Sequence, residues 1–439
     1  MIPQEVKQIM ETLRRGGYEA FVVGGCVRDI LRGVAPHDWD ITTSALPEET
    51  MALFPHFAIP TGLKHGTVTV RSGSYSCEVT TYRADGDYSD HRRPDGVTFT
   101  RSLREDLARR DFTVNAMAMD VHGTVHDDFG GQEDLKKGIL RCVGEPTRRF
   151  GEDALRILRA LRFSSTLGFP IESETKAAIF ALKDDLRYVA AERVREEVTK
   201  LLLGPGVETV LTEFPAVLGV VIPEVLPAVG FDQRNRHHCL DVWAHTARAV
   251  AQVEPDALLR WVMLLHDLGK PETFTLDDMG EGHFYGHADR SENIAQEVCR
   301  RLRFDNRSRE RILRLVRYHD RPVALTEKAI TRLLRKLGVE DSRALCAIKR
   351  ADNLAQHPDY RGRQREIHEA ERIIDAILEK EHCFSLQHLA VDGNDLLSLG
   401  LRGKAIGQTL EQLLTAVMEG GLPNEKEALL EEIKGKQVL

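Results

Sequence analysis

The hydrophobic pattern of this 439-residue chain changes once, near residue 147. Between residues 19 and 145, short β-rich runs such as AFVVGG, GTVTVRSG and SCEVTTYR alternate with turns and short helical stretches. From residue 147 to the end, amphipathic helical patterns dominate and are interrupted by prolines such as Pro223 and Pro322. The sequence therefore predicts an α+β protein in which a small mixed sheet precedes an all-α region.

Composition restricts the class of protein. The chain has 60 Lys and Arg against 68 Asp and Glu, a formal net charge of -8, so any nucleic-acid site must be a local patch. No apolar run is long enough to span a bilayer and the N-terminal segment lacks a secretory hydrophobic region, so we expect a cytoplasmic protein with no membrane partner. The seven cysteines include no Cys-x-x-Cys pair, which predicts buried thiols.

The segment FVVGGCVRDILRG, residues 21–33, predicts a strand, a Gly24–Gly25 turn and a helix. A glycine pair lets the backbone approach a ligand, and the free N–H groups of a helix N-terminus suit phosphate. Next, Asp38 and Asp40 alternate with Trp39 in an expected strand, which directs both carboxylates to one face where they can share divalent cations. Glu78 is a candidate third acid from a neighbouring strand. An isolated Asp-x-Asp is more typical of a polar edge strand, but the glycine turn and the Arg-rich LREDLARRDFTVNAMA favour nucleotidyl transfer.

A polar series recurs at every third position in FGEDALRILRALRF, residues 150–163. Its members are Asp153, Arg156, Arg159 and Arg162. On one helix they would form a single polar stripe, which is commonly a solvated face. Because the planar fork of arginine also suits phosphate and base edges, a ligand-binding stripe is the alternative.

Six segments follow one another in the order of the motifs of class II tRNA nucleotidyltransferases, the CCA-adding enzymes, and related bacterial poly(A) polymerases. They are GGCVRD, HDWD, RRDFTVNAMA, DLKKGILRCVG, EDALRILRALRF and ERVREEVTKLL. Over roughly its first half the chain resembles this family. The resemblance implies a polymerase-β-like palm followed by helical neck, body and tail domains, with tRNA as partner, ATP and CTP as substrates and Mg²⁺ as cofactor.

The resemblance also assigns roles to residues. It implies Asp38 and Asp40 as Mg²⁺ ligands and Gly25, Arg28 and Arg110 as triphosphate contacts, and in the resulting scheme Glu78, the candidate from the neighbouring strand, joins the two aspartates as a catalytic acid. Asp153 and Arg156 would read the incoming base: a carboxylate accepting from an exocyclic amino group and a guanidinium donating to a ring nitrogen select C and A over U and G. Arg159 and Arg162 would then contact phosphate or sugar.

Three alternatives remain open at this stage. A-only addition or poly(A) synthesis uses the same motifs. A hydrolase with an RNA-binding palm is a second alternative, and a tRNA-binding protein without activity is a third. Residues 84–103 resemble a flexible loop that CCA- and A-adding members carry and CC-adding members lack, which disfavours CC-only addition.

A second group of residues lies in the helical region. His245, the adjacent His266–Asp267 and Asp352 follow the H…HD…D order of the HD phosphohydrolase superfamily, which they resemble. A lone histidine on an apolar helix is more often a core residue, but this set indicates a second divalent-metal site. His287 and His319 are candidates for a second metal shell. The resemblance implies phosphatase or phosphodiesterase activity; the alternative is a scaffold.

We predict four domains from these patterns. They are a nucleotidyltransferase head over residues 1–145, a neck with the base-reading helix over 146–230, an HD-type helical domain over 231–360 and a helical tRNA-binding tail over 361–439. In the tail, Arg402 and Lys404 of RGKAIG are candidate contacts to tRNA phosphate, although the turn equally suits a simple helix start. The sequence leaves the oligomeric state open.

Overall fold

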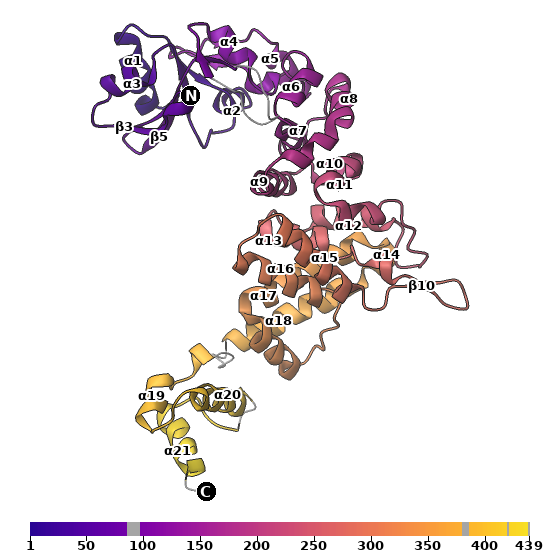
Figure 1. Cartoon of the computed structure of the whole chain (residues 1–439). Coiled ribbons are helices and arrows are strands. Elements are labelled where there is room, and N and C mark those ends of the chain that lie inside the picture. The colour runs from indigo at the N-terminus through magenta and orange to yellow at the C-terminus, as the bar shows by residue number, and fades with distance from the viewer. Residues whose placement is uncertain (86–96, 380–385, 419–420, 438–439) are drawn as a thin grey trace. The chain divides into compact units, whose positions relative to one another are not determined.

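A mixed β-sheet organises the first part of the chain (Figure 1). This computed structural model describes all residues except 86–96, 380–385, 419–420 and 438–439, and its seven-stranded sheet has the order β3-β4-β5-β2-β1-β8-β9. Neighbouring strands are antiparallel except β2 and β5, which are parallel. The strands are β1 (Ala20–Val23), β2 (Asp40–Thr43), β3 (Ala58–Gly62), β4 (Thr67–Ser72), β5 (Tyr75–Thr81), β8 (Ala118–Met119) and β9 (Val125–His126). The prediction of a mixed sheet is confirmed.

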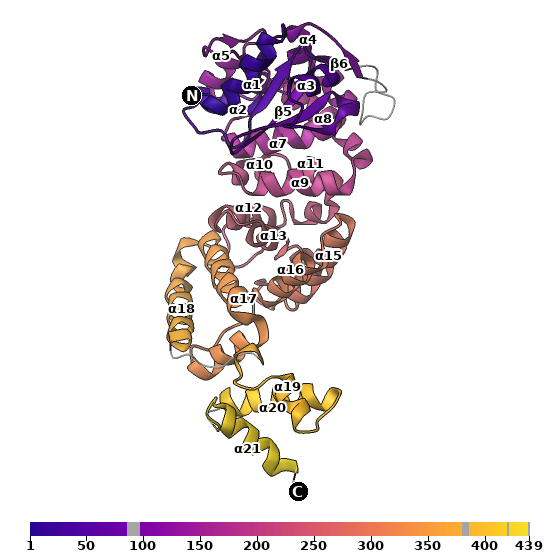
Figure 2. The same ribbon diagram turned by 90° about the vertical axis from the view of Figure 1, so that its left-hand side faces the viewer.

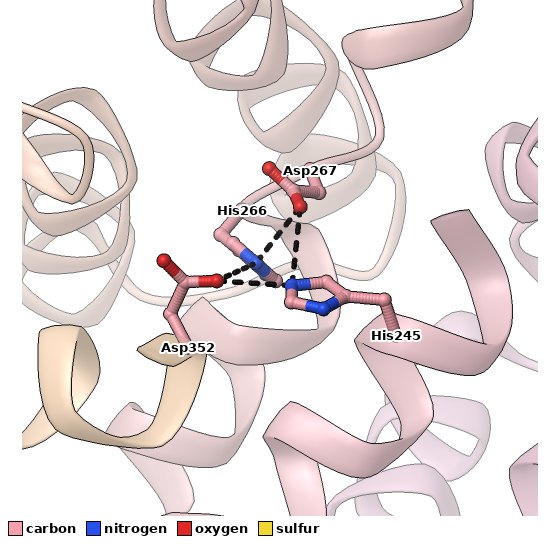
Figure 3. A group of neighbouring side chains, drawn as sticks. All are labelled: His245, His266, Asp267 and Asp352. Carbon is pink, nitrogen blue, oxygen red and sulfur yellow. Dashed lines mark hydrogen bonds and ion pairs between the residues drawn. The ribbon is translucent and has the colours of Figure 1, made fainter. Parts of the chain in front are cut away.

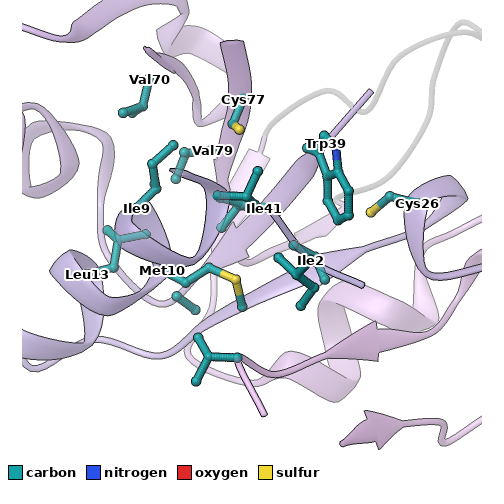
Figure 4. Packing of buried hydrophobic residues seen from close by; sticks show 14 of the residues in the cluster. Ile2, Ile9, Met10, Leu13, Cys26, Trp39, Ile41, Val70, Cys77 and Val79 are labelled. Atoms are coloured by element: carbon teal, nitrogen blue, oxygen red, sulfur yellow. The ribbon is translucent and has the colours of Figure 1, made fainter. Parts of the chain in front are cut away.

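Helix α1 (Gln4–Arg15) contributes to the main core of the sheet. Ile9, Met10 and Leu13 lie at helical spacing on its buried side, and Figure 4 shows them packed toward Ile41 of β2 and Val79 of β5. The other helices of this region are short: α2 (Gly25–Leu31), α3 (Pro47–Leu53), α4 (Leu103–Ala108) and α5 (Gly131–Lys137). A two-stranded sheet, β6 (Arg83–Asp85) and β7 (Val97–Phe99), flanks residues 86–96, so most of the predicted loop lies outside the described residues.

Helices follow the sheet region. They are α6 (Pro146–Glu152), α7 (Leu155–Leu167), α8 (Ser173–Leu182), α9 (Ala191–Leu202), α10 (Val207–Glu213) and α11 (Pro215–Val221). Helix α7 packs along α9 (Figure 2) and buries Ile157, Leu158 and Leu161. The prediction of one helix through residues 150–163 is wrong at Asp153, whose φ of -142° and ψ of 102° separate α6 from α7.

The chain divides into two compact units, residues 1–226 with 301–303 and residues 227–300 with 304–439. The helices of the second unit are α12 (Val242–Gln252), α13 (Ala257–Leu265), α14 (Lys270–Thr273), α15 (His287–Arg301), α16 (Asn306–Tyr318), α17 (Glu327–Ala355), α18 (Gln364–Glu379), α19 (Gly393–Ser398), α20 (Lys404–Met418) and α21 (Lys426–Gln437). Among its described residues, the sheet is a hairpin of β10 (Thr275–Leu276) and β11 (Gly282–His283). The division into four domains stays a prediction.

Within the second unit, α17 packs against both α12 and α18. Ile330 and Leu334 of α17 share one apolar cluster with Ile374 of α18, and α19–α21 enclose another around Leu396 and Leu429. In the part of the chain that the structure describes, no helix combines the length and apolar character that crossing a membrane requires. Five cysteines are buried without disulfides, as predicted, Cys239 is exposed, and Cys383 lies outside the described residues.

Candidate active site and candidate metal centre

One cavity of about 550 Å³ in the first unit brings together most of the residues predicted for nucleotide chemistry. Segments far apart in the sequence form it: the turn after β1, the start of β2, the RRDFTVNAMA segment and α7. The predicted residues that line it are Gly25, Arg28, Asp38, Asp40, Arg110, Asp153, Arg156, Arg159 and Arg162. Glu78 is not among the residues that line the cavity.

The two acids of HDWD are both exposed, but only one belongs to a strand. Asp40 begins β2, whereas Asp38 lies in a bend before it, so the prediction that both alternate along one strand is wrong for Asp38. The ladder between β2 and β5 begins at Asp40, and no strand partner extends it to residue 38. Trp39 between them is only 4% exposed, so its anchored ring leaves its two acidic neighbours at the surface.

Glu78 lies beside Asp40 in the sheet. The two residues are partners in the parallel register of β2 and β5, so their side chains emerge on the same face of neighbouring strands. Desolvation by the surrounding protein raises the pKa of Asp40; Arg110 opposes this, while Glu78 and Asp38 add to it by repulsion. A divalent cation would relieve that repulsion, and carboxylate oxygens are the ligands that Mg²⁺ prefers. Among the described residues, however, Asp38, Asp40 and Glu78 do not bring three oxygens within 4.8 Å of one another.

The glycine turn places the backbone close to the arginines. Gly24 has a φ of +80°, and a Cβ at this position would lie 3.1 Å from Nη1 of Arg110. Arg28, on α2, donates from Nη1 to Oδ1 of Asn115 over 2.7 Å and pairs with Asp29 at 2.9 Å. The turn and both guanidinium groups therefore share one corner of the cavity.

The arginines of α7 are each paired with an acid from another position. Nη1 of Arg156 lies 2.7 Å from Oε2 of Glu152, Nη2 of Arg159 lies 2.5 Å from Oδ2 of Asp111, and Nε of Arg162 lies 2.6 Å from Oε2 of Glu197. Arg162 also lies over the ring of Phe163, 3.9 Å from its centroid. The polar stripe is thus a fixed array that faces the cavity rather than a freely solvated face.

Asp153 occupies the break between α6 and α7. Its Oδ1 accepts the N–H of Leu155 over 3.0 Å, and its Oδ2 lies 3.3 Å from Nη2 of Arg193 on α9. Arg156, in the first turn of α7, is only 8% exposed and also donates to the carbonyl oxygens of Arg149 and Arg109. Both side chains line the cavity, although they do not belong to one continuous helix. Their role as base readers stays a prediction.

Sequence reasoning missed several residues that also line the cavity. They are Arg109, Asp111, Asn115, Phe163 and Arg193. All five lie inside segments that carry the family resemblance, so the signal was present in RRDFTVNAMA, EDALRILRALRF and ERVREEVTKLL. Pairing partners such as Asp111 for Arg159 could not be assigned without the fold, because they are 48 residues apart.

The second unit brings four predicted metal ligands together (Figure 3). Asp241 caps α12 and precedes His245, while His266 and Asp267 follow the end of α13 and Asp352 lies near the end of α17. Nε2 of His245 lies 2.9 Å from Oδ1 of Asp352, and Nε2 of His266 lies 3.2 Å from Oδ2 of Asp267. One ligand atom from each of the four lies within 4.8 Å of the others.

The chemistry of this donor set suits a cation. Nε2 of His266 and Oδ2 of Asp267 are buried and lack a partner with hydrogen-bond geometry, although they form ion pairs with each other at 3.2 Å and, for Oδ2, with Nζ of Lys270 at 2.7 Å. Although burial opposes it, the nearby Asp267 raises the pKa of His266 to about 10, and the histidines hold the pKa values of Asp267 and Asp352 well below their usual range. Positive charge is therefore strongly favoured at the centre of the group, where a divalent ion would replace the proton.

Asp267 also belongs to a second group with His287 and His319. The Nε2 atoms of the two histidines lie 3.2 Å apart, and each Nδ1 is directed at a backbone oxygen, of Phe284 and Val316 respectively. If each Nδ1 carries the proton, both Nε2 atoms are acceptors that face one another. Two ligands of one tetrahedral ion lie about 3.3 Å apart when each metal–nitrogen bond is about 2.0–2.1 Å. The pair thus has the spacing of two ligands of one metal.

A cavity of about 760 Å³ opens onto these groups within the second unit. Lys270, whose Nζ lies 2.7 Å from Oδ2 of Asp267, lines it together with Arg236 and Arg363. These cations suit an anionic ligand beside the candidate metals. In the tail, Arg402 and Lys404 are exposed, and α20 begins at Lys404; their contact to tRNA stays a prediction.

Family models match three stretches of the chain. They are the poly A polymerase head domain over residues 20–141, the probable RNA and SrmB-binding site of polymerase A over 168–213, and the HD domain over 236–356. The first two cover the sheet, the part of the cavity that precedes residue 142, and Arg193, whereas the cavity residues of 153–163 lie between the two matches. The third contains every candidate metal ligand of the second unit. Fold and site together define a nucleotidyltransferase head joined to a helical body with an HD domain.

The curated relatives that the chain resembles are CCA-adding enzymes. The chain is 47% identical over 276 residues to the CCA-adding enzyme of Geobacillus thermodenitrificans, which covers 62% of this chain and 64% of the relative. It is 51% identical over 219 residues to that of Oceanobacillus iheyensis, covering 50% and 54%. Both matches thus span less than two thirds of the relative's length.

A solved structure is similar to this chain over the whole length of the chain. The crystal structure of the Bacillus stearothermophilus CCA-adding enzyme in complex with CTP has a TM-score of 0.72 and 31% identity, and the match covers 100% of this chain and 98% of that one. The chain belongs to the family of CCA-adding enzymes.

Proposed function

We propose that this chain is a tRNA nucleotidyltransferase that transfers CMP and AMP from CTP and ATP to the 3′ end of tRNA with release of pyrophosphate. The observation that carries the proposal is the single cavity in which acids and arginines of distant segments meet. Eight arginines and five aspartates line it, an excess of positive charge that suits a triphosphate. The similar Bacillus stearothermophilus structure holds CTP, which supports a nucleotide as ligand.

Different residues of the cavity bind the phosphates and the metal ion. The Gly24–Gly25 turn lets the backbone approach the phosphates, which Arg28 and Arg110 contact. Asp38 and Asp40, with Glu78 beside them, would hold Mg²⁺, which would activate the attacking ribose hydroxyl and neutralise charge on the leaving pyrophosphate. The protein supplies no covalent nucleophile in this scheme, so its contribution is positioning and electrostatics.

Base choice falls to Asp153 and Arg156. The carboxylate of Asp153 accepts from the amino group of C or A, and Arg156 donates to the adjacent ring nitrogen. U and G would leave these groups facing like partners, at a cost of about 1–3 kcal/mol for each unpaired buried group. For this step the guanidinium of Arg156 must share its hydrogen bonds with Glu152 and the backbone.

Incubation of the protein with Mg²⁺, tRNA that lacks its 3′ terminus and each labelled nucleoside triphosphate tests the proposal. We expect CMP incorporation from CTP alone and AMP only after the cytidines. Incorporation of AMP alone would support the A-adding or poly(A) alternative, and cleavage of the tRNA end without addition would support a hydrolase. The names of the curated relatives favour CCA addition over both. We place the reaction in the cytoplasm, where tRNA and both triphosphates are present.

A second candidate function is phosphohydrolysis at the HD groups. The buried, cation-seeking cluster of His245, His266, Asp267 and Asp352 favours it over a scaffold role. A divalent metal held there would activate water for attack on a phosphoester, with Lys270 beside it to pair with the phosphate. Chelator-treated protein titrated with Mn²⁺, Ni²⁺ or Mg²⁺ should bind at least one of these ions and then hydrolyse p-nitrophenyl phosphate. Metal binding without hydrolysis of this or a nucleotide substrate would leave the site structural.

A further inference from the structure

We propose that Asp106 is a positioning residue for the triphosphate of the incoming nucleotide and that it acts through Arg109 and Arg110. The inference rests on the proposed nucleotidyl transfer and extends it to a residue that cannot touch the substrate. Asp106 lies on α4, its side chain is 0% exposed, and it does not line the cavity. Arg109 and Arg110, in contrast, both line it.

Each carboxylate oxygen of Asp106 binds an arginine. Oδ1 accepts from Nη2 of Arg109 over 2.8 Å and from its Nε over 3.0 Å, and Oδ2 accepts from Nη2 of Arg110 over 3.3 Å. Because Arg109 and Arg110 follow α4 directly, their flexible side chains would otherwise be free to sample many rotamers. The buried carboxylate therefore orders two cavity-lining guanidinium groups before a ligand binds.

The same carboxylate is tied to the sheet. Thr42 of β2 donates from its hydroxyl to Oδ2 over 3.0 Å, and the backbone N–H of Arg83 at the start of β6 donates to Oδ1 over 3.4 Å. Thr42 follows Asp40 by two residues on one strand. Asp106 thus links the arginines that would bind the phosphates to the strand that carries an expected Mg²⁺ ligand, so that the two sets of groups keep a fixed separation.

The contact pattern distinguishes Asp106 from a buried acid with only a structural role. Asp134 in the same unit is also buried, at 5% exposed, and is bonded to the hydroxyl of Thr113 and to Nε of Arg141. None of these three residues lines the cavity. Asp134 is therefore a matched control for the loss of a buried carboxylate.

Asp106→Asn tests the proposal, with Asp134→Asn as control. In Asp106→Asn the KM for CTP and the inhibition constant of inorganic tripolyphosphate should rise together, by about tenfold, because charge-assisted bonds that order both arginines are weakened. The KM for the tRNA primer and the preference for CTP over UTP should stay within about twofold, since Asp106 acts on the two triphosphate-binding arginines and contacts neither Asp153 nor Arg156. In Asp134→Asn all four quantities should stay within about twofold. Equal loss of primer and CTP binding, or unchanged tripolyphosphate inhibition, would overturn the proposal.

Two further variants keep the test decisive. In a background that carries both Arg109→Gln and Arg110→Gln, Asp106→Asn should add less than about a third of its effect on the KM for CTP, because both guanidinium groups through which it acts are already lost. If Asp106→Asn does not fold, Thr42→Val removes one bond to the carboxylate without leaving a charge unpaired and should raise the tripolyphosphate inhibition constant about two- to threefold. No change in Thr42→Val would then refute the proposal. Failure of wild-type protein to extend tRNA would instead refute the proposed function.

Discussion

At the scale of single residues, Asp40 joins the sheet to the cavity. It begins β2, lines the cavity and lies beside Glu78 in the register of the sheet. Desolvation and the acidic neighbours Glu78 and Asp38 raise the pKa of Asp40, so a bound cation would stabilise its ionised carboxylate. This position makes Asp40 the strongest test of the proposed metal-dependent transfer.

We expect Asp40→Ala to lower kcat for nucleotide addition by more than about a thousandfold, because the Mg²⁺ that stabilises the transition state loses a ligand. The dissociation constant for tRNA, measured by filter binding, should stay within about twofold. The matched control is Asp128→Ala, which removes an exposed carboxylate that does not line the cavity. Equal loss of binding and turnover in Asp40→Ala would indicate a structural role instead.

Asp153→Ala should relax base choice more than it slows turnover. With the accepting carboxylate absent, the preference for CTP over UTP should fall about tenfold, which corresponds to about 1.4 kcal/mol for one lost charge-assisted bond. Competition assays with mixed labelled triphosphates measure this ratio directly. Arg193→Gln removes only the guanidinium that pairs with Asp153 and should shift the ratio in the same direction but less. Unchanged discrimination in both variants would count against base reading by this pair.

The sequence indicated which residues line the cavity more readily than which residues pair with one another. Motif order indicated Asp38, Asp40, Arg28 and Arg110, and all four line one cavity. Both Asp111 and Glu197 lie in segments that carry the family resemblance, but their pairing with Arg159 and Arg162 has no local signal, because a buried ion pair across the fold leaves no periodic pattern in the sequence. Their assignment required the three-dimensional structure.

At the scale of elements, the break between α6 and α7 shows where periodicity misleads. Apolar spacing predicted one helix through residue 153, but the side chain of Asp153 accepts the N–H of Leu155 and competes with the helical backbone. The start of β2 also differs from the predicted strand, which included Asp38. Hydrogen-bonded pairing with β5 begins only at Asp40, and this pairing, rather than side-chain alternation, decides where the strand begins. Both differences fall at predicted functional residues, where local polar chemistry outweighs propensity.

The ion pair between Asp111 and Arg159 ties the RRDFTVNAMA segment to α7 and should make the stability of the first unit depend on pH. Burial opposes ionisation, yet Arg159 holds the pKa of Asp111 below its usual value of 3.8. A carboxyl whose folded-state pKa is lowered contributes stability above its unfolded pKa and loses it as the pH falls through the folded value. Asp111→Asn should therefore be less stable than wild type by about 1–3 kcal/mol at pH 7.

Urea unfolding at several pH values checks this prediction. The difference between wild type and Asp111→Asn should be constant from pH 7 to about pH 5 and should shrink below about pH 4, as Asp111 becomes protonated in the wild type. Glu133→Gln is the control, because Glu133 forms an exposed pair with Lys137 on α5 and should change stability little at any pH. A difference that grows on acidification would contradict the assignment.

At the scale of the whole molecule, the two proposed activities fall in different units. All residues that line the nucleotide cavity belong to the first unit, and all described candidate ligands of the HD groups belong to the second. The sequence predicted this succession because the switch from mixed strand patterns to helical patterns and the order of motifs are both global features. The residue at which one unit ends and the next begins is harder to predict from the sequence, since both sides of the boundary are helical and no change in composition marks it.

We expect Asp267→Asn to abolish or weaken divalent-metal binding by at least tenfold, because Asp267 belongs to both ligand groups. Nucleotide addition in Mg²⁺ should remain within about twofold of wild type. Calorimetric titration with Mn²⁺ and the tRNA extension assay measure the two effects. Asp289→Asn, which alters an exposed carboxylate on α15, should change neither. Parallel loss of addition in Asp267→Asn would show that the two chemistries are coupled.

The orientation of three histidines in the second unit has a kinetic consequence. His266, His287 and His319 each direct Nδ1 at the backbone oxygen three residues earlier, of Met263, Phe284 and Val316. The main chain thereby fixes the ring angle of each side chain and keeps Nδ1 as the nitrogen that carries a proton, independently of any bound ion. The centre is preorganised, so ion capture should be limited by access and deprotonation rather than by rearrangement of the ligands.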